Sequence, residues 1–395
     1  MLAKRVSRIE LSPTLKMSAR TQELRREGVD IVDFSVGEPD FPTPEAIKKA
    51  GIRAIEENFT KYVANDGIAD LKAAIIEKLK KDNGLDYKKD EIIVSPGAKS
   101  CLMNAATALL EEGDEVLIPT PCWVSYPDQV KLTGADPVFI PTKEENGFLL
   151  DPKDLKRAIT PKTKALVLNY PSNPTGGLYS GEQLKEIADI CVEKNIWVVS
   201  DEIYEKLVYD GRKFVSIASF GDKIKSRTIV INGFSKAYAM TGWRLGYAAG
   251  PKEVISACSK IQSHNTSNAT SFVQKAAVVA LTSCDAEVEN MRAEFEKRRN
   301  MIVGLLQKID GVTVSNPGGA FYVMPNISRY LGKKHGGETL KNTYDLSYYL
   351  LNEAHTAVIP GEAFMSPSHI RLSFATSTER IEEGVRRIGE ALGKL

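Results

Sequence analysis

The segment from Ser235 to Arg244 holds the residue types best suited to covalent chemistry. It follows an apolar run and brings a serine, a lysine and an arginine into one short stretch. A lysine becomes a nucleophile, or forms a Schiff base with a carbonyl compound, when burial or neighbouring cations lower its pKa. Ser235 and Arg244 could hold a phosphate group, the arginine through a bidentate fork. Because lysines are mostly exposed, a lone Ser-Lys pair is usually a surface feature, and Lys236 needs support from other segments.

In two other segments a polar residue follows the end of an expected strand. Asn173 lies in the run Asn169–Gly176, whose prolines, asparagines and glycine are typical of a rigid turn. Asp201 follows the apolar run Trp197–Ser200. Open α/β sheets bind ligands at the carboxyl ends of their strands, so both side chains would share one crevice. There Asp201 could keep a cofactor's ring nitrogen protonated. The alternatives are a simple turn for Asn173 and a helix N-cap for Asp201.

A fourth segment, Ser95–Ser100, joins an expected strand to an expected helix through Pro96 and Gly97. Backbone N–H groups at the start of a helix form a binding site for phosphate. Glycine is common at any turn between a strand and a helix, so this signal is weak alone.

The elements around these segments predict an α/β domain. Short apolar or β-branched runs alternate with helical or turn segments, as in a largely parallel sheet. Thr43-Pro44 predicts the N-cap and first residue of a helix that ends near Asn58, and a second helix is expected from about Ile68 to Asn83. The strands are expected at Glu91–Ser95, Glu115–Ile118, Pro137–Ile140, Ala165–Asn169, Ile196–Ser200, Thr228–Ile231 and Leu245–Ala249.

The pattern changes after Cys284. Ala286–Asp310 predicts one long, charged, amphipathic helix that links the first domain to a smaller α+β unit. We expect the strands of that unit at Val312–Ser315, Ala320–Met324, Ala357–Ile359 and Ile370–Phe374, and its helices near Asp345–Ala354 and Thr378–Leu392.

Composition excludes several classes of protein. A chain of 395 residues is longer than one core usually supports, so we expect two domains. Lys plus Arg is 52 against 51 Asp plus Glu, which gives no basic excess for nucleic acid or an anionic membrane. Five scattered cysteines argue against a disulfide framework or a metal site. The sequence has no signal peptide and no membrane-spanning run, so we expect a cytoplasmic protein.

Together, and in this order, the four segments resemble the class I and II aminotransferases of fold type I, which use pyridoxal 5′-phosphate. The resemblance runs from about Ser12 to Leu392. Within the family the chain is similar to the bacterial and plastid aspartate aminotransferase branch, which includes bifunctional aspartate/prephenate enzymes. The matching motifs are Gly37-Glu38-Pro39-Asp40-Phe41, Tyr62, Trp123, Asn173-Pro174-Thr175-Gly176, Asp201-Glu202-Ile203-Tyr204, Asn232 to Arg244, Gly319-Ala320-Phe321-Tyr322 and Arg371-Leu372-Ser373-Phe374.

The resemblance implies a specific α/β architecture. A large cofactor domain with a mostly parallel sheet flanked by helices would span residues 45–285. A smaller α+β domain would combine both chain ends, residues 1–44 and 286–395. The family also implies a homodimer whose active sites lie at the subunit interface.

The resemblance also assigns roles to residues. The catalytic residues would be Lys236, as Schiff-base lysine and base, with Asp201 and Tyr204. Asp201 would pair with the ring nitrogen, Asn173 and Tyr204 would bind the phenolic oxygen, and Trp123 would stack on the ring. The phosphate would be held by Ala98, Lys99, Ser235, Arg244 and the partner subunit's Tyr62. The substrate α-carboxylate would meet Gly37, Trp123, Asn173 and, through a bidentate contact, Arg371.

For substrates, the resemblance favours L-aspartate with 2-oxoglutarate and leaves prephenate open as a second acceptor. Thr14, in Ser12-Pro13-Thr14, could donate to the distal carboxylate, although such runs also serve as plain turns. Lys16, Lys99 and His264 are further candidates for that contact. An aromatic or alanine-type aminotransferase, or a pyridoxal phosphate-dependent lyase of the same fold, remains the alternative.

Overall fold

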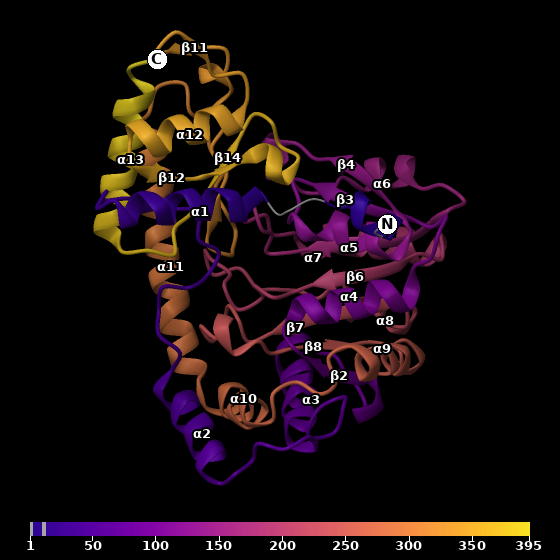
Figure 1. Ribbon diagram of the computed structural model, residues 1–395. Coiled ribbons are helices and arrows are strands. Elements are labelled where there is room, and N and C mark those ends of the chain that lie inside the picture. The colour runs from indigo at the N-terminus through magenta and orange to yellow at the C-terminus, as the bar shows by residue number, and fades with distance from the viewer. Residues whose placement is uncertain (1–2, 10–12) are drawn as a thin grey trace.

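The computed structural model describes residues 3–9 and 13–395. In this part of the chain a large lobe and a small lobe are joined by the long helix α11 (Asp285–Leu306), which runs from one lobe to the other in Figure 1. The large lobe is a sheet covered by helices on both faces, and the small lobe combines short strands with helices. The predicted α/β class with a smaller α+β unit is confirmed.

Within the described residues the large sheet has seven strands, in the order β2-β8-β7-β6-β5-β3-β4. All seven runs predicted for this sheet form strands. Only β8 runs antiparallel to its neighbours β2 and β7, while the other pairs are parallel. The bounds are β2 Ile92–Ser95, β3 Glu115–Thr120, β4 Asp136–Pro141, β5 Thr163–Asn169, β6 Trp197–Asp201, β7 Thr228–Gly233 and β8 Gly246–Ala249.

The register brings the chemically important strand ends to one edge of this sheet. Asn169 pairs with Asp201 across β5 and β6. Gly246, at the start of β8, pairs with Ser95 at the end of β2 and with Gly233 at the end of β7. The segments that follow these strands therefore converge at the same edge.

Successive residues of the strands alternate between the two faces of the sheet, as the period of two requires. Ile93 and Ile229 pack toward one group of helices, and Val94 and Val230 pack toward another. The first group is α4 (Ala98–Leu109), α5 (Ser125–Thr133) and α9 (Lys252–Asn265). The opposite face is covered by α2 (Glu45–Glu56), α3 (Ala69–Asn83), α6 (Pro152–Ala158), α7 (Gly181–Glu193), α8 (Asp222–Lys225) and α10 (Ser271–Ser283).

The start of α2 differs from the prediction. Pro44, rather than Thr43, is the N-cap, and the first helical residue is Glu45. The hydroxyl of Thr43 instead donates a hydrogen bond of 2.6 Å to the carbonyl oxygen of Ala239, in the loop after Lys236. A contact distant in sequence thus replaces the local cap.

The small lobe contains segments from both ends of the chain. Near the N-terminus, β1 (Val32–Asp33) pairs in parallel with β12 (Thr356–Ala357). In the described residues a second sheet has the order β13-β14-β9, and β10 pairs with β11 as a hairpin. Their bounds are β9 Tyr322–Val323, β10 Lys334–His335, β11 Glu338–Thr339, β13 Ile359–Pro360 and β14 Ile370–Ser373. The helices are α1 (Pro13–Arg26), α12 (Thr343–Glu353) and α13 (Thr378–Leu392).

Two strand predictions in the small lobe are wrong. Val312–Ser315 forms no named strand, and only Thr313 makes an isolated bridge, to Asn326. Val312 is buried but the side chain of Thr313 is exposed, and the residues from Val314 to Pro317 have no regular secondary structure. The predicted strand Ala357–Ile359 divides at Val358, because residues on its two sides pair with different sheets.

Candidate active site

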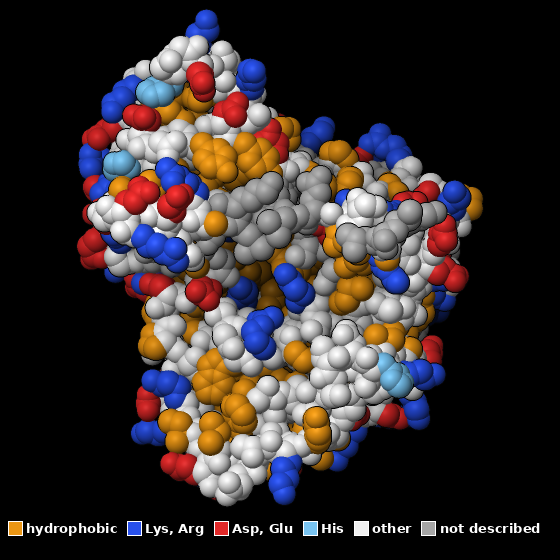
Figure 2. All heavy atoms as spheres, viewed as in Figure 1, with side chains coloured by type: hydrophobic (Ala, Val, Ile, Leu, Met, Phe, Trp, Pro, Cys, Tyr) orange, Lys and Arg blue, Asp and Glu red, His pale blue; other side chains and the backbone are white. Residues whose placement is uncertain are grey.

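A cavity of about 380 Å³ lies between the carboxyl edge of the large sheet and the small lobe. Figure 2 shows the hollow between the lobes, with Lys and Arg side chains around it. Most of the predicted site residues line this cavity, namely Gly37, Ala98, Lys99, Trp123, Asn173, Asp201, Tyr204, Ser235, Lys236, Arg244 and Arg371. Residues that are more than 300 positions apart in sequence thus share one site.

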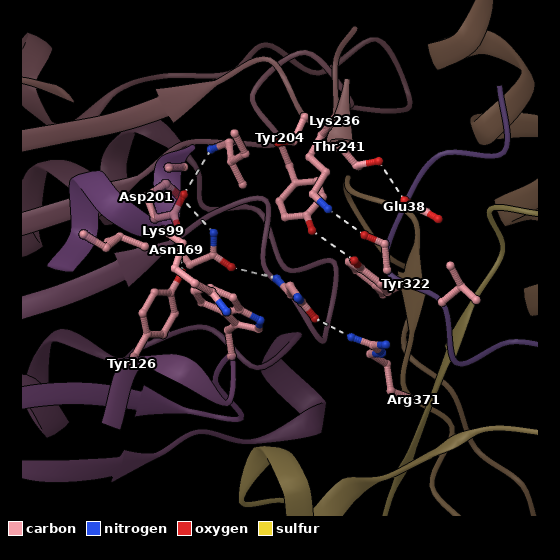
Figure 3. Close-up of a pocket in the computed structure, with 18 of the residues that line it drawn as sticks. Glu38, Lys99, Tyr126, Asn169, Asp201, Tyr204, Lys236, Thr241, Tyr322 and Arg371 are labelled. Carbon is pink, nitrogen blue, oxygen red and sulfur yellow. Dashed lines mark hydrogen bonds between the residues drawn. The ribbon is translucent and has the colours of Figure 1, made fainter. Parts of the chain in front are cut away.

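Lys236 lies shortly after β7, and its Nζ donates a hydrogen bond of 2.6 Å to the carbonyl oxygen of Gly37 (Figure 3). Burial is the main cause that lowers its pKa, to about 8, and the positive charge of Arg371 acts in the same direction. The carboxylates of Glu38 and Asp201 oppose this shift. An amine with a pKa near neutrality can accept a proton or attack a carbonyl group at physiological pH.

Asp201, the last residue of β6, is buried at the opposite side of the cavity. Its Oδ2 accepts a hydrogen bond of 2.7 Å from the Tyr126 hydroxyl, and its Oδ1 accepts one of 3.3 Å from the N–H of Ile203. Burial is the main cause that raises its pKa, to about 6, and these hydrogen bonds oppose the shift. A turn, not a helix, follows in this described stretch, so the alternative of a helix N-cap is wrong.

Arg371 enters the cavity from β14 and is 4% exposed. Its Nη1 donates to Asn173 Oδ1 at 3.0 Å, and its Nη2 donates to the carbonyl oxygen of Ser35 at 2.8 Å. Its Nε has no partner among the described residues. The guanidinium lies 4.5 Å from the centre of the Tyr322 ring. A buried cation with a spare donor in a cavity favours an anionic ligand.

Asn173 lies in the turn after β5 and also lines the cavity. In the turn after β5, its backbone N–H donates a hydrogen bond of 2.8 Å to the side-chain Oδ1 of Asn169, the last residue of that strand. Its side-chain oxygen faces Arg371 in the cavity. The turn therefore holds the amide where it can also contact a ligand.

Aromatic rings form much of the remaining wall. The hydroxyls of Tyr204 and Tyr322 lie 3.0 Å apart, and Figure 3 shows both side chains beside Lys236. Trp123 packs edge to face on Tyr126, with ring centres 5.3 Å apart. The Nζ of Lys99 lies 4.7 Å from the centre of the Trp123 ring. Partial burial and the nearby Arg244 lower the pKa of Lys99.

The start of α4 and Arg244 meet at a turn that requires glycine. Gly97 has φ +87°, and a Cβ there would lie 2.6 Å from Arg244 Nη2. A Cβ on Gly246 would lie 2.3 Å from the backbone nitrogen of Ala98. No side chain caps α4, so its first N–H groups remain available to an anion. Ser235, 8% exposed, lines the same cavity.

The segment after β1 closes the cavity from the small-lobe side. Gly37 accepts the hydrogen bond from Lys236, and a Cβ on Gly37 would lie 3.1 Å from the Tyr322 hydroxyl oxygen. The adjacent Glu38 accepts a hydrogen bond of 2.7 Å from the Thr241 hydroxyl, which belongs to the loop after Lys236 (Figure 3). Both contacts connect the N-terminal segment to the lysine loop.

Some predicted residues are not part of this cavity. Tyr62 is 91% exposed and does not line it. Of the candidates for a distal carboxylate, Lys99 lines the cavity, whereas His264 is exposed on α9 and does not. The Thr14 and Lys16 side chains lie outside the part of the chain that the structure describes, and so does Ser12.

The cavity is also lined by residues for which no role was predicted, among them Tyr126, Asn169, Tyr322, Glu38 and Thr241. Asn169 could have been identified, because it ends β5 as Asp201 ends the neighbouring β6. Tyr126 has no comparable signal, since its position depends on how α5 packs on the sheet.

Other kinds of site find no support within residues 3–9 and 13–395. There, no group of three or more His, Cys, Asp or Glu side chains could hold a metal ion, and no helix is long and apolar enough to cross a membrane. The five cysteines, all of which the structure describes, are buried free thiols.

Comparisons with known proteins agree with this geometry. The "Aminotransferase class I and II" family matches residues 29–388. A "Probable aspartate/prephenate aminotransferase" of Aquifex aeolicus is 48% identical, and the match covers 100% of this chain and 99% of the relative. The structure of an aspartate aminotransferase from Rhizobium meliloti superposes with a TM-score of 0.97 at 43% identity, and covers 100% of this chain and 99% of that one.

A second solved structure, an aspartate aminotransferase from Thermus thermophilus with maleate, has a TM-score of 0.93 at 41% identity, and the match covers 99% of both chains. These matches span almost the whole sequence, including both lobes and every segment that lines the cavity. This chain therefore belongs to the class I and II aminotransferases.

Proposed function

We propose that this protein is a pyridoxal 5′-phosphate-dependent aminotransferase in which Lys236 holds the cofactor and moves the substrate proton. The observation that carries the proposal is the Lys236 amine, whose pKa is lowered to about 8 inside a cavity that also contains Asp201 and Arg371. This arrangement offers an amine that loses its proton readily, a carboxylate and a buried cation to one small ligand.

The phosphate end of the cofactor fits the turn at α4. Gly97 leaves room for the Arg244 guanidinium beside the first helical amides, because a Cβ would fill that space. We infer that Ala98 and Lys99 donate backbone N–H groups to the phosphate and that Ser235 and Arg244 bind it with their side chains.

The ring end of the cofactor fits the opposite side of the cavity. Asp201 is ionised at neutral pH and would pair with the ring nitrogen and keep it protonated. Trp123 would stack on the ring, while Asn173 and Tyr204 would bind its phenolic oxygen. All of these side chains line the cavity.

Bound pyridoxal 5′-phosphate supplies an electron sink for the electron pair left on the substrate Cα when its proton is removed. Lys236 would take that proton from the substrate Cα and hold it on Nζ until it is returned. Asp201 would favour this step through its negative charge. Exchange of one 2-oxo acid for another, followed by the same steps in reverse, gives ping-pong kinetics.

Arg371 would bind the substrate α-carboxylate, together with Asn173, Trp123 and the backbone of Gly37. Anchoring the carboxylate fixes the direction of the Cα–H bond relative to Lys236, so proton transfer is favoured over other bond cleavages. This contact favours transamination over decarboxylation, although some lyases share the same arginine.

We propose L-aspartate with 2-oxoglutarate as the substrate pair, with prephenate to be tested as a second acceptor. The names of the relatives in Aquifex aeolicus and Rhizobium meliloti support this choice. Both substrates carry a distal carboxylate, which needs a further donor. Once Lys236, Arg244 and Arg371 have their roles, Lys99 is the remaining cation among the described lining residues. Thr14 stays a second candidate.

We infer that two copies form a homodimer, in which the partner subunit's Tyr62 would reach the phosphate. Tyr62 is 91% exposed, and Ile52 and Ile55 on α2 are also exposed. Figure 2 shows hydrophobic side chains gathered over the region of α2 and α10. We expect the protein to act in the cytoplasm, where its buried free cysteines stay reduced.

The experiment that tests the proposal starts with the protein loaded with pyridoxal 5′-phosphate. Adding L-aspartate should shift the visible absorbance of the cofactor, and a 2-oxo acid should reverse the shift. The ratio kcat/KM is then measured for oxaloacetate, 2-oxoglutarate, prephenate and phenylpyruvate in wild type, Lys99→Gln and Thr14→Val. We expect Lys99→Gln to lose about tenfold or more with the dicarboxylates and little with phenylpyruvate.

Several outcomes would contradict parts of the proposal. A clear preference for phenylpyruvate over the three dicarboxylates would indicate an aromatic aminotransferase, and a preference for L-alanine would indicate an alanine-type enzyme. Elimination products without transfer of the amino group would indicate a lyase. An equal loss for all acceptors in Lys99→Gln would remove Lys99 from distal recognition.

A further inference from the structure

Gln262, on α9, lies outside the cavity, is 0% exposed and uses its whole carboxamide in hydrogen bonds. Its Oε1 accepts from the Ser95 hydroxyl at 2.6 Å and from Asn104 Nδ2 at 3.1 Å. Its Nε2 donates to the carbonyl oxygens of Asn65 at 2.7 Å and Val94 at 2.9 Å. A carboxamide has two donors and two acceptor lone pairs, so the side chain is fully satisfied.

Three of these contacts fix the strand and helix on either side of the turn at Gly97. Val94 and Ser95 are the last residues of β2, and Asn104 lies in the second turn of α4. Gln262 therefore connects the end of the strand to the helix from behind, at a site that water does not reach. Buried networks of this kind are rigid when every member is satisfied.

The turn tolerates little displacement, because its backbone is in close contact with two other segments. The Ala98 nitrogen lies so near β8 that a Cβ on Gly246 would come within 2.3 Å of it. A Cβ on Gly97 would lie 2.6 Å from the Nη2 atom of Arg244. A shift of a few tenths of an ångström would move the first helical amides relative to Arg244 and Ser235.

Ser235 provides an independent indication of a ligand at this point. It is 8% exposed and lines the cavity together with Arg244 and Ala98. A buried hydroxyl beside a guanidinium and free helix amides matches the oxygen atoms of a phosphate group.

We propose that Gln262 is a positioning residue for the phosphate site, which acts by holding the Ser95–Gly97 turn and the start of α4 against Arg244. This inference rests on the proposed function, since it takes the cofactor phosphate as the ligand. In this proposal Gln262 contacts neither the substrate nor the cofactor. Its effect is therefore specific to ligands that carry the phosphate.

The test compares the affinity of the apoprotein for pyridoxal 5′-phosphate and for pyridoxal, which lacks the phosphate. Dissociation constants are measured by quenching of intrinsic fluorescence for wild type, Gln262→Leu and Ser95→Ala. Gln262→Leu should weaken pyridoxal 5′-phosphate binding about tenfold or more and change pyridoxal binding by less than about twofold. Ser95→Ala removes only one hydrogen bond and should cause a smaller change of the same kind, about threefold.

Thr228→Val is the matched control. Thr228 is also fully buried in the large sheet, and its hydroxyl donates a hydrogen bond of 2.8 Å to the Ile224 carbonyl oxygen. It starts β7, at the end of the sheet away from the cavity. Thr228→Val should lower the thermal stability of the protein and leave the ratio of the two dissociation constants unchanged.

Each outcome decides a separate point. The positioning role is wrong if the ratio of the two dissociation constants in Gln262→Leu and Ser95→Ala equals that of wild type, including the case in which both ligands bind equally more weakly. If Gln262→Leu does not fold, the ratio in Ser95→Ala decides. If wild type itself binds pyridoxal 5′-phosphate no better than pyridoxal, the assigned phosphate site fails, and the proposed function fails with it.

Discussion

Replacing Tyr126 by Phe removes one hydroxyl group and tests how the charge of Asp201 is maintained. The Tyr126 hydroxyl donates a hydrogen bond of 2.7 Å to Asp201 Oδ2, and both residues are buried. Burial alone favours the protonated acid, and this hydrogen bond is the largest influence that favours the carboxylate. The ring of Tyr126 would remain in Tyr126→Phe, so packing against Trp123 is retained.

The size of the effect follows from the geometry. A hydrogen bond to a charged buried group contributes about 1.5–3 kcal/mol, and one pKa unit corresponds to about 1.4 kcal/mol. Tyr126→Phe should therefore raise the pKa of Asp201 by roughly one to two units above its value of about 6. Near pH 7 the variant would then hold a largely neutral acid where wild type holds a carboxylate.

The assay is infrared difference spectroscopy of the apoprotein, labelled with ¹³C-aspartate and titrated from pH 5 to 9. The band of a protonated carboxylic acid that is missing in Asp201→Asn identifies Asp201. Tyr179→Phe is the control, because Tyr179 is also buried and its hydroxyl accepts a hydrogen bond of 3.0 Å from the N–H of Leu150. A shift below about half a unit in Tyr126→Phe, or an equal shift in Tyr179→Phe, would refute the reasoning.

The higher pKa of Asp201 in Tyr126→Phe should also make the stability of the protein more dependent on pH. The pKa of folded Asp201 is above its ordinary value of 3.8, so the folded state binds more protons than the unfolded state between pH 3.8 and about 6. The free energy of unfolding therefore falls as pH rises through this window. In Tyr126→Phe the window extends upward, and the variant should lose about 1.4–2.8 kcal/mol more than wild type between pH 6 and 8. Thermal melting at fixed protein concentration checks this.

The remaining predictions concern three other residues. Lys236→Ala should abolish turnover but still fold and bind pyridoxal 5′-phosphate without a covalent bond, and near wild-type activity would show that another group moves the proton. Arg371→Leu leaves the α-carboxylate without its charged partner, which typically costs about 2–5 kcal/mol, or roughly thirty- to several thousand-fold in kcat/KM. A substrate titration measures this loss, and one below about threefold would mean that another cation binds the carboxylate. Glu202 is fully buried and burial raises its pKa from 4.5 to about 8, so wild type loses stability as pH rises between these values. Glu202→Gln removes that dependence and should gain roughly 2–5 kcal/mol relative to wild type from pH 5 to 8, whereas a constant difference across pH would contradict it.

The sequence predicted the large lobe well, because its strands are continuous apolar runs with turns between them. In a run such as Thr228–Gly233 every residue is buried, and a central strand is one of the few conformations that allow this. The small lobe was less predictable, because strands such as β12 and β13 are only two residues long. So short a run carries no periodicity, and tertiary contacts alone decide its pairing.

The chemistry of the site could be predicted only as far as residue types and strand ends allow. Asp201 and Asn173 follow apolar runs, so their convergence was expected from the topology of a parallel sheet. Tyr126, whose hydroxyl stabilises the Asp201 carboxylate, is 75 positions away in sequence and lies on α5. No local pattern encodes that contact, and the same holds for the Gln262 network behind the α4 turn.

Arg371 is the residue for which the resemblance implies a bidentate contact with the substrate α-carboxylate. Two of its five N–H donors are used within the protein, one from each Nη, on Asn173 and Ser35. The buried Nε has no partner among the described residues. We expect a carboxylate to bind this guanidinium while both internal hydrogen bonds persist. Because Asn173 and Ser35 hold the guanidinium plane before a ligand arrives, little side-chain entropy is lost on binding, and lysine at this position could not replace it.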